Sequence, residues 1–278
     1  MKLNQYTWNL YKQTEIGTKE IKYFSDAGGY DLFKKYCPHS NFIPKDLYND
    51  WLEGIHCYGV SEYDLPTSLN EAKDLYTSLI SLGIRIEGQQ WLPANDFKNT
   101  LGFIQPISYV LSRFAPEYFF PYLFLCRIFE LNKIADFFNI DLPNIPKRTD
   151  YKGRCMYYWE LCEVFYQFRK ENRLTPEELY AFLYDFAPSN ITNEKIDIPK
   201  PSQAWFIGGR LYAEDKSLVS KFWQSSPDAK KGDILVHYET SPVSSITCIE
   251  TSLTNGAIDP LFRYYGCIYI SNRINIPH

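Results

Sequence analysis

The chain has 278 residues, among them 23 Tyr, 19 Phe and 6 Trp, and a formal net charge of -4. Burial of so many large apolar side chains can offset the entropy of ordering, so intrinsic disorder is excluded. The weak negative charge excludes the class of nucleic-acid binders that are strongly basic over the whole chain.

The first 187 residues have a mainly helical pattern. Ser68 and Glu71 have the spacing of a capping box before a run of apolar residues at helical spacing, and Gly83 is a typical helix stop. A second capping box, Thr175 to Glu178, predicts another helix start. This part of the chain is expected to be a helical domain whose role is not assigned.

Two long helices are predicted between these boxes, near 117–139 and 153–172. The apolar stretch 118–129 contains Pro121 and is shorter than the roughly 20 residues of a membrane span, so it predicts a buried helix. In 153–172, aromatic and Cys residues recur every three to four positions, which is most simply a core face. No membrane association is expected.

A Pro-containing stretch, 188–203, is interpreted as a linker. Beyond it the pattern changes to short runs of β-branched and aromatic residues. The expected elements are a strand over 204–207 before Gly208-Gly209, a helix over 215–223, and strands over 233–238, 245–250 and 264–270. The sequence therefore predicts an α+β protein with a helical domain (1–187), a linker (188–203) and a small β-rich domain (204–278).

Metal and cofactor motifs are weak. Seven cysteines include no C-x-x-C pair, and Cys37, His39, His56 and Cys57 would form a site only if the two pairs met. We predict no metal site and no cofactor. Because the cysteines have no evident disulfide pattern and the N-terminus has no apolar signal segment, a cytoplasmic location is expected.

Catalytic motifs are also missing from the sequence. It contains neither a phosphate-binding loop nor a G-x-S-x-G elbow, so no enzyme activity is predicted. His237 on a predicted strand is the one candidate general base, with Cys248 on the next strand. Whether the two meet depends on strand register, which the sequence does not define. An enzyme that uses His237 stays the third hypothesis.

An ordered set of residues in the C-terminal quarter carries a family resemblance. The set comprises Trp205, Trp223, the turn Lys230-Lys231-Gly232-Asp233, Tyr238 and Asp259-Pro260. It resembles the EVE-type branch of the PUA-like superfamily, which is related to YTH and ASCH domains. Two features depart from that pattern. Glu239-Thr240-Ser241 replaces the usual His-Ser, and the sequence ends at His278 where the family continues, as expected of a fragment or an incomplete domain.

The resemblance implies a small barrel-type domain that binds DNA or RNA and recognises a modified base, flipped or unpaired, in an aromatic pocket. The implied pocket residues are Trp205, Trp223, Tyr238 and Ser241. Gly232 and Asp233 would support the pocket through their turn. Candidate phosphate contacts are Arg210, Lys230 and Lys231.

Such domains accompany effectors in modification-dependent restriction and phage defence, so an effector beyond residue 278 is one expectation. The alternative hypothesis is a protein-interaction adaptor or scaffold without nucleic-acid binding, in which the helical domain supports self-association or binds a partner. The charge distribution favours the C-terminal part for a polyanion only slightly. Residues 200–278 have eight Lys and Arg against seven Asp and Glu.

Overall fold

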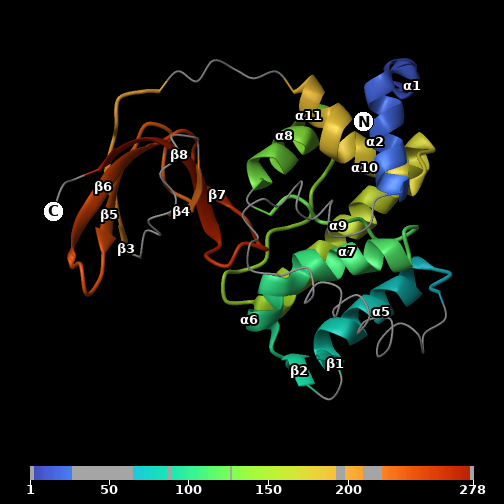
Figure 1. The fold of residues 1–278 in the computed structure, drawn as a ribbon, viewed down its shortest axis with the longest axis horizontal. Helices are drawn as coiled ribbons and strands as arrows, with labels where there is room; N and C mark the ends of the chain where they lie inside the picture. Colours follow the sequence, from blue (N-terminus) through green and yellow to red (C-terminus); the bar gives the residue numbers. More distant parts are fainter. Residues whose placement is uncertain are drawn as a thin grey trace. The chain divides into compact units, whose positions relative to one another are not determined.

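A computed structural model describes residues 3–26, 65–86, 89–125, 127–191, 198–208 and 221–275. The chain divides into two compact units, Met1–Thr192 and Asn193–His278, and we call them the helical unit and the sheet unit. This boundary lies within the linker expected from the sequence. One unit is built mainly of helices and the other of a mixed sheet (Figure 1), so the predicted α+β class is confirmed.

The helical unit begins with α1 (Gln5–Gln13) and α2 (Glu15–Asp26). The side chain of Asn4 caps α1 by accepting two backbone N–H groups. Trp8 is fully buried and packs edge-on against Phe186, with ring centroids 5.2 Å apart. Trp8 is therefore a large aromatic anchor that holds the first helix to the core.

Helix α5 (Leu69–Leu82) has the predicted ends. Ser68 Oγ accepts the N–H of Glu71 at 3.3 Å, and the helix stops at Gly83 with a φ of 77°. The Glu71 carboxylate accepts the backbone N–H of Thr67 at 2.8 Å. The cap at Ser68 is thus confirmed, while the reciprocal bond is made one residue earlier than in a standard capping box.

A hairpin and three helical segments follow. They are β1 (Ile84–Ile86), antiparallel to β2 (Gln89–Leu92), then α6 (Phe97–Thr100), a 3-10 turn (Leu101–Phe103) and α7 (Ile104–Phe114). Nine consecutive residues of α7, from Ile104 to Ser112, are buried. This helix therefore runs through the core of the unit.

The predicted helix over 117–139 is wrong in its first half. Only α8 (Ile128–Phe138) is helical there, and the described residues from Ala115 to Arg127 form turns and irregular chain. Pro121 explains the difference, because it lacks an N–H group and disfavours a helical conformation at the residue before it. The prediction of burial holds, since Phe119 to Phe124 are all buried.

This buried irregular segment obtains hydrogen bonds from side chains, as a buried backbone must. Three tyrosine hydroxyls donate to consecutive carbonyls, Tyr180 to Phe119, Tyr158 to Phe120 and Tyr184 to Pro121. The N–H of Tyr122 donates to Ser108 Oγ at 2.8 Å. Part of the aromatic excess therefore supplies hydrogen-bond donors to the core.

Helix α9 (Tyr151–Asn172) confirms the predicted helix over 153–172. Asp150 caps its first turn by accepting the N–H of Gly153 at 2.8 Å, and Arg173 ends it in the left-handed conformation. Its aromatic and Cys side chains are mostly buried, as predicted for a core face. Burial raises the pKa of the Cys162 thiol to about 12, so this thiol stays protonated.

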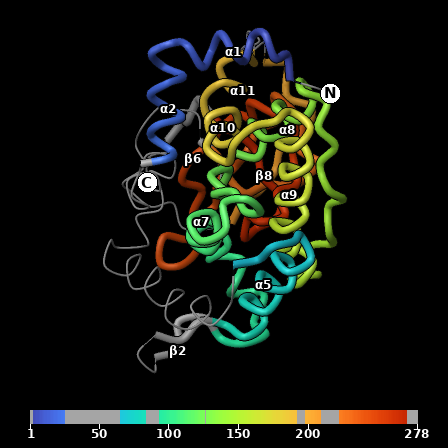
Figure 2. Tube along the Cα trace, turned by 90° about the vertical axis from the view of Figure 1, so that its right-hand side faces the viewer, coloured from blue at the N-terminus to red at the C-terminus, as the bar shows by residue number. Residues whose placement is uncertain are grey.

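The predicted capping box at Thr175 is confirmed with both of its hydrogen bonds. It begins α10 (Pro176–Ala181), which continues as a π-helical turn (Phe182–Phe186) and α11 (Ala187–Asn190). Pro188 therefore lies within a helix and not in the linker assigned from the sequence. Helix α2 lies against α10 (Figure 2).

The sheet unit contains β3 (Ala204–Gly208), β4 (Lys221–Gln224), β5 (Ile234–Glu239), β6 (Ser245–Ser252), β7 (Ala257–Ile258) and β8 (Gly266–Asn275). The strand order is β3-β5-β6-β8-β4, with β7 also paired to β8. Only β3 and β5 are parallel among the described strands. These strands form an open sheet, so the barrel stays a prediction.

The predicted helix over 215–223 is wrong at its end, because Lys221–Gln224 is strand β4, paired with β8. The rest of that prediction lies outside the described residues. The core of the unit is a cluster of buried apolar side chains, namely Ile207, Ala229, Leu235, Ile268 and Ile270. Across both units, none of the described helices is long and apolar enough to cross a membrane.

Candidate functional site

The basic-Gly-Asp turn leads directly into β5. The N–H of Asp233 donates to the carbonyl of Lys230 at 3.0 Å, which closes the turn. Gly232 has a φ of +93°, and a Cβ on it would lie 2.5 Å from the carbonyl oxygen of Pro199. Both the backbone conformation and the close approach require glycine here.

The Asp233 carboxylate is the centre of this turn and is fully buried. It accepts hydrogen bonds from the Lys230 N–H (2.9 Å), Trp205 Nε1 (2.9 Å), Gln203 Nε2 (2.9 Å) and Ser202 Oγ (2.8 Å). Burial alone would raise the pKa of Asp233, but these four bonds to the charged form hold it well below its ordinary value of 3.8. Asp233 thereby fixes β3 and the basic turn to each other.

Trp205 and Trp223 come from opposite ends of the strand order. Trp205 on β3 is in register with Leu235 on β5, whereas Trp223 on β4 is in register with Ile268 on β8. Both tryptophans are only partly buried, and both pack against the same apolar cluster. The sheet must therefore curve, so that the two partly buried indoles share one face, which we call the inner face.

Trp223 also contacts a polar group on this face. Its ring lies edge-on to the imidazole of His237, with centroids 5.7 Å apart. Its indole Nε1 is buried and has no hydrogen-bond acceptor among the described residues. A buried donor without an acceptor is unfavourable by about 1–3 kcal/mol.

Next to Trp223 lies a buried polar group formed by His237, Cys248 and Glu250, whose exposed fractions are 3%, 1% and 2%. His237 and Cys248 are directly opposite each other on β5 and β6, which answers the register question that the sequence left open. His237 Nε2 and Glu250 Oε2 are 2.6 Å apart. Glu250 is not among the residues assigned from the sequence. Its position two residues after Cys248, and so on the same face of a strand, could have identified Glu250 as a member of this group.

Tyr238 and Ser241 are not brought together with the tryptophans. Along β5, Leu235 and His237 are buried, while Tyr238 is 38% exposed and points to the opposite face, which we call the outer face. Ser241 lies exposed in the turn between β5 and β6. The predicted pocket residues are thus divided between two faces of one sheet and a turn.

The predicted phosphate contacts are partly located. Lys230 is exposed and Lys231 is half-buried, and both belong to the turn that Asp233 ties to Trp205. Arg210 lies outside the described residues. Asp259, from the Asp-Pro pair, is buried and its Oδ1 accepts the N–H of Leu261 at 3.0 Å. Its role in the described structure is to shape a turn.

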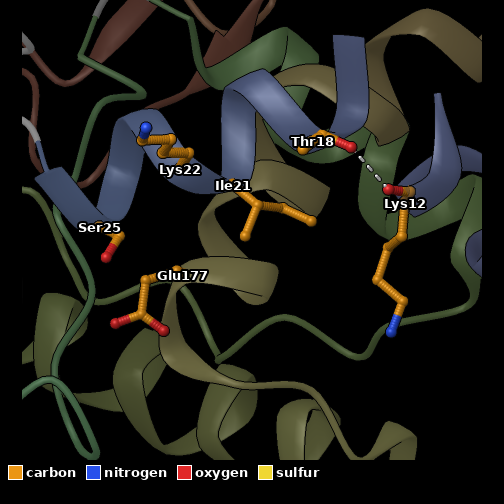
Figure 3. A pocket seen from close by; sticks show the side chains of 6 residues that line it. All are labelled: Lys12, Thr18, Ile21, Lys22, Ser25 and Glu177. Carbon is orange, nitrogen blue, oxygen red and sulfur yellow. Dashed lines mark hydrogen bonds between the residues drawn. The ribbon is translucent and has the colours of Figure 1, made fainter. Parts of the chain in front are cut away.

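The helical unit has a hollow of about 460 Å³ between α2 and α10 (Figure 3). It is lined by Lys12, Thr18, Ile21, Lys22, Ser25 and Glu177. Lys12 forms an ion pair with Glu178 at 2.9 Å, and the lining carries both signs of charge. Partly exposed pairs of this kind contribute little energy. We therefore place the candidate site on the inner face of the sheet unit.

Comparison of the chain with protein-family models, curated protein sequences and solved structures found no match. The resemblance to EVE-type domains therefore stays a prediction based on the residues quoted above.

Proposed function

We propose that the sheet unit binds nucleic acid by stacking an unpaired base on the inner face, against Trp205 and Trp223. The observation that carries this proposal is the meeting of two partly exposed indoles on one apolar cluster, although they come from opposite ends of the strand order. Trp8 and Trp159 in the helical unit are, by contrast, almost completely buried.

Stacking provides affinity without much positive charge. Each base presents a π-face, and stacking on an aromatic side chain contributes about 1–3 kcal/mol. A methyl group on the base adds about 0.8 kcal/mol when it is buried in an apolar environment. Extracting a base from a duplex costs a few kcal/mol, so unpaired or destabilised bases are the preferred ligands. A modified base is therefore the substrate class that we propose.

The basic turn supports the same proposal. Lys230 belongs to the turn that Asp233 links to the indole of Trp205, and Lys231 is its neighbour. A base stacked near Trp205 would have its phosphate within reach of a flexible ammonium group. The electrostatic contribution to the binding affinity is small, because only two lysines are involved.

The test is a titration of the full chain with a fluorescent single-stranded oligonucleotide, read by anisotropy, in DNA and RNA versions. Competitors are the same strand with an internal methylated base, with an abasic position, and annealed to its complement. Preference for the methylated strand over the abasic and paired strands supports the proposal. Equal competition by all strands would reduce it to general nucleic-acid binding, and absence of binding would overturn it.

The resemblance supports a wider proposal, in which this module provides specificity to a defence or RNA-handling protein. Within that proposal the chain itself performs no catalysis. Modified and unmodified phage DNA, used as competitors in the same titration, distinguish a defence role from RNA handling.

One observation favours the alternative of a protein-binding adaptor. The outer face carries exposed apolar side chains at Phe206 (72% exposed), Tyr238 (38%) and Ile246 (37%), and Tyr238 is in register with Ile246. Such patches often mark protein interfaces. If this function dominates, Phe206→Ser disrupts a concentration-dependent association in sedimentation, while oligonucleotide binding stays undetectable in the wild type.

A further inference from the structure

We propose that His237, Cys248 and Glu250 form a binding site for a divalent transition metal, with Zn²⁺ the expected ion. Among the residues that the structure describes, these three form a group whose ligand atoms all lie within 4.8 Å of one another. They provide one nitrogen, one sulfur and one oxygen donor, which are the three donor types that Zn²⁺ uses in proteins.

The strand register creates this group. His237 on β5 is directly opposite Cys248 on β6, and Glu250 follows Cys248 at the next position on the same face. Directly opposite positions such as His237 and Cys248 have Cβ atoms about 4.5–5.5 Å apart, and diagonal positions such as His237 and Glu250 are about 7–8 Å apart, which long side chains can span. Three donors thus converge from two adjacent strands, so the site does not depend on a loop.

Two of the three donors are already close together. His237 Nε2 and Glu250 Oε2 are 2.6 Å apart and almost fully buried. A hydrogen on Nε2 can bridge these two atoms as a hydrogen bond. A metal ion can take the place of that hydrogen, because the nitrogen then offers its lone pair and the carboxylate its negative charge.

The geometry needs only small adjustments for Zn²⁺. With Zn–N and Zn–O near 2.0 Å and Zn–S near 2.3 Å, tetrahedral ligand atoms lie about 3.3–3.5 Å from each other. The imidazole and carboxylate would separate by about 0.7 Å, which side-chain rotation allows. The Cys248 thiol proton would be released as the ion binds, and the hydrogen on Nε2 of His237 would move to Nδ1 or, from an imidazolium, to solvent. Water can occupy the fourth position.

Trp223 borders the site, because its ring contacts His237 edge-on. An apolar neighbour lowers the local dielectric constant and strengthens metal–ligand bonds. The ion would join β5 to β6 directly behind the indole that we propose to contact a base. The metal proposal does not depend on nucleic-acid binding, because its donors and its test concern the ion alone.

The experiment uses the full chain, purified without chelator, and measures bound metal by elemental analysis. The protein is then stripped of metal and titrated with Co²⁺, a spectroscopic substitute for Zn²⁺, and Zn²⁺ is used to displace it. We expect one ion per chain, a thiolate-to-cobalt charge-transfer band and intense visible bands typical of tetrahedral Co²⁺. Wild-type protein without these bands would overturn the proposal, whatever the behaviour of the variants.

Variants assign the ligands. Cys248→Ser should abolish the charge-transfer band and weaken Zn²⁺ binding by at least about tenfold, and Glu250→Gln should weaken binding but keep the band. The matched control is Cys267→Ser, which alters another fully buried thiol of the same sheet, in contact with the Ala257 carbonyl at 3.6 Å. This control should keep both the band and the affinity.

A second control addresses the other candidate ligands in the sequence. The double variant Cys37→Ser/Cys57→Ser removes both cysteines of the two Cys/His pairs. Under our proposal this variant binds one Co²⁺ with an unchanged charge-transfer band. Loss of the band here, together with its retention in Cys248→Ser, would assign the metal to those pairs and overturn the proposal.

Discussion

The indole Nε1 of Trp205 donates a hydrogen bond to the buried carboxylate of Asp233 at 2.9 Å. This bond joins the first strand of the sheet unit to the basic turn before β5, and the same carboxylate accepts the N–H of Lys230. One acidic side chain thus orients a partly exposed aromatic ring and a positively charged turn. The base stacking and phosphate contacts that we propose would use this arrangement.

The first prediction concerns Asp233→Asn. An amide presents its NH₂ group to donors that need an acceptor, and the buried donors around it then lose part of their hydrogen bonding. We expect a loss of about 1–3 kcal/mol in the free energy of unfolding of the sheet unit, measured by urea titration. Asp228→Asn is the control, because Asp228 is exposed. Its effect should stay within about 0.5 kcal/mol.

The pH dependence of stability provides the second prediction. The pKa of Asp233 is lowered in the folded state, so its contribution is present above the ordinary value of 3.8 and is lost as the pH falls toward the folded pKa. Wild-type stability should therefore decrease on acidification below about pH 4 more steeply than that of Asp233→Asn. If the stability of the wild type and of Asp233→Asn decreased equally on acidification, the hydrogen bonds to Asp233 would have no net effect on its ionisation.

Gly232→Ala tests the turn itself. The φ of +93° at Gly232 is unfavourable for any residue with a side chain, and an added Cβ would lie 2.5 Å from the carbonyl oxygen of Pro199. We expect the free energy of unfolding of the variant to be lower than that of the wild type by about 1–3 kcal/mol, because the turn must shift. Gly208→Ala is the matched control, since its Cβ would meet nothing within 4 Å. Equal effects of the two substitutions would contradict the structural role of the turn.

In the helical unit, Tyr184→Phe tests the support of the buried irregular segment. The Tyr184 hydroxyl donates to the carbonyl of Pro121 and accepts the N–H of Leu123 at 3.3 Å. Its removal leaves two buried backbone groups without this partner and should lower the unfolding free energy by about 1–3 kcal/mol. Tyr6→Phe is the control, because Tyr6 is 74% exposed. An unchanged free energy of unfolding in Tyr184→Phe would mean that other contacts hold the segment in place.

The sequence predicted the parts of the fold that depend on local signals. The caps at Ser68 and Thr175, helix α9 and the starts of β5 and β6 all follow from spacing and turn residues. The helix predicted around Pro121 is wrong, because the apolar content of this segment is typical of a helix core. Its backbone is held by tyrosine hydroxyls from distant parts of the chain, and local patterns do not show such bonds.

Individual turn residues near the candidate site were predictable from the sequence, but the arrangement of the site was not. The turn residues Gly232 and Asp233 can be identified from their order alone, since each has a local physical reason. The division of Trp223 and Tyr238 between two faces depends on strand alternation and sheet curvature. The meeting of His237 with Glu250 depends on register, and register is a non-local property of the sheet.

The contribution of the basic turn to binding can be tested by measuring affinity at different salt concentrations. If Lys230 and Lys231 each neutralise one phosphate of a single strand, Lys230→Gln/Lys231→Gln should reduce the slope of log K against log salt by about 1.4. The matched control is Lys147→Gln/Arg148→Gln, which removes the same charge from exposed residues of the helical unit. Anisotropy titrations at several salt concentrations measure both slopes. Identical decreases would indicate a general effect of net charge.

The most direct test of the central claim compares Trp223→Leu with Tyr238→Leu in the affinity of the full chain for a single-stranded oligonucleotide. Leucine keeps apolar packing against the core but removes the stacking ring, and Tyr238 is an exposed aromatic on the outer face. Circular dichroism and urea titration establish that both variants are folded. We predict that Trp223→Leu weakens binding by about 5- to 150-fold, while Tyr238→Leu leaves it unchanged. Unchanged binding by folded Trp223→Leu would contradict a base-binding inner face.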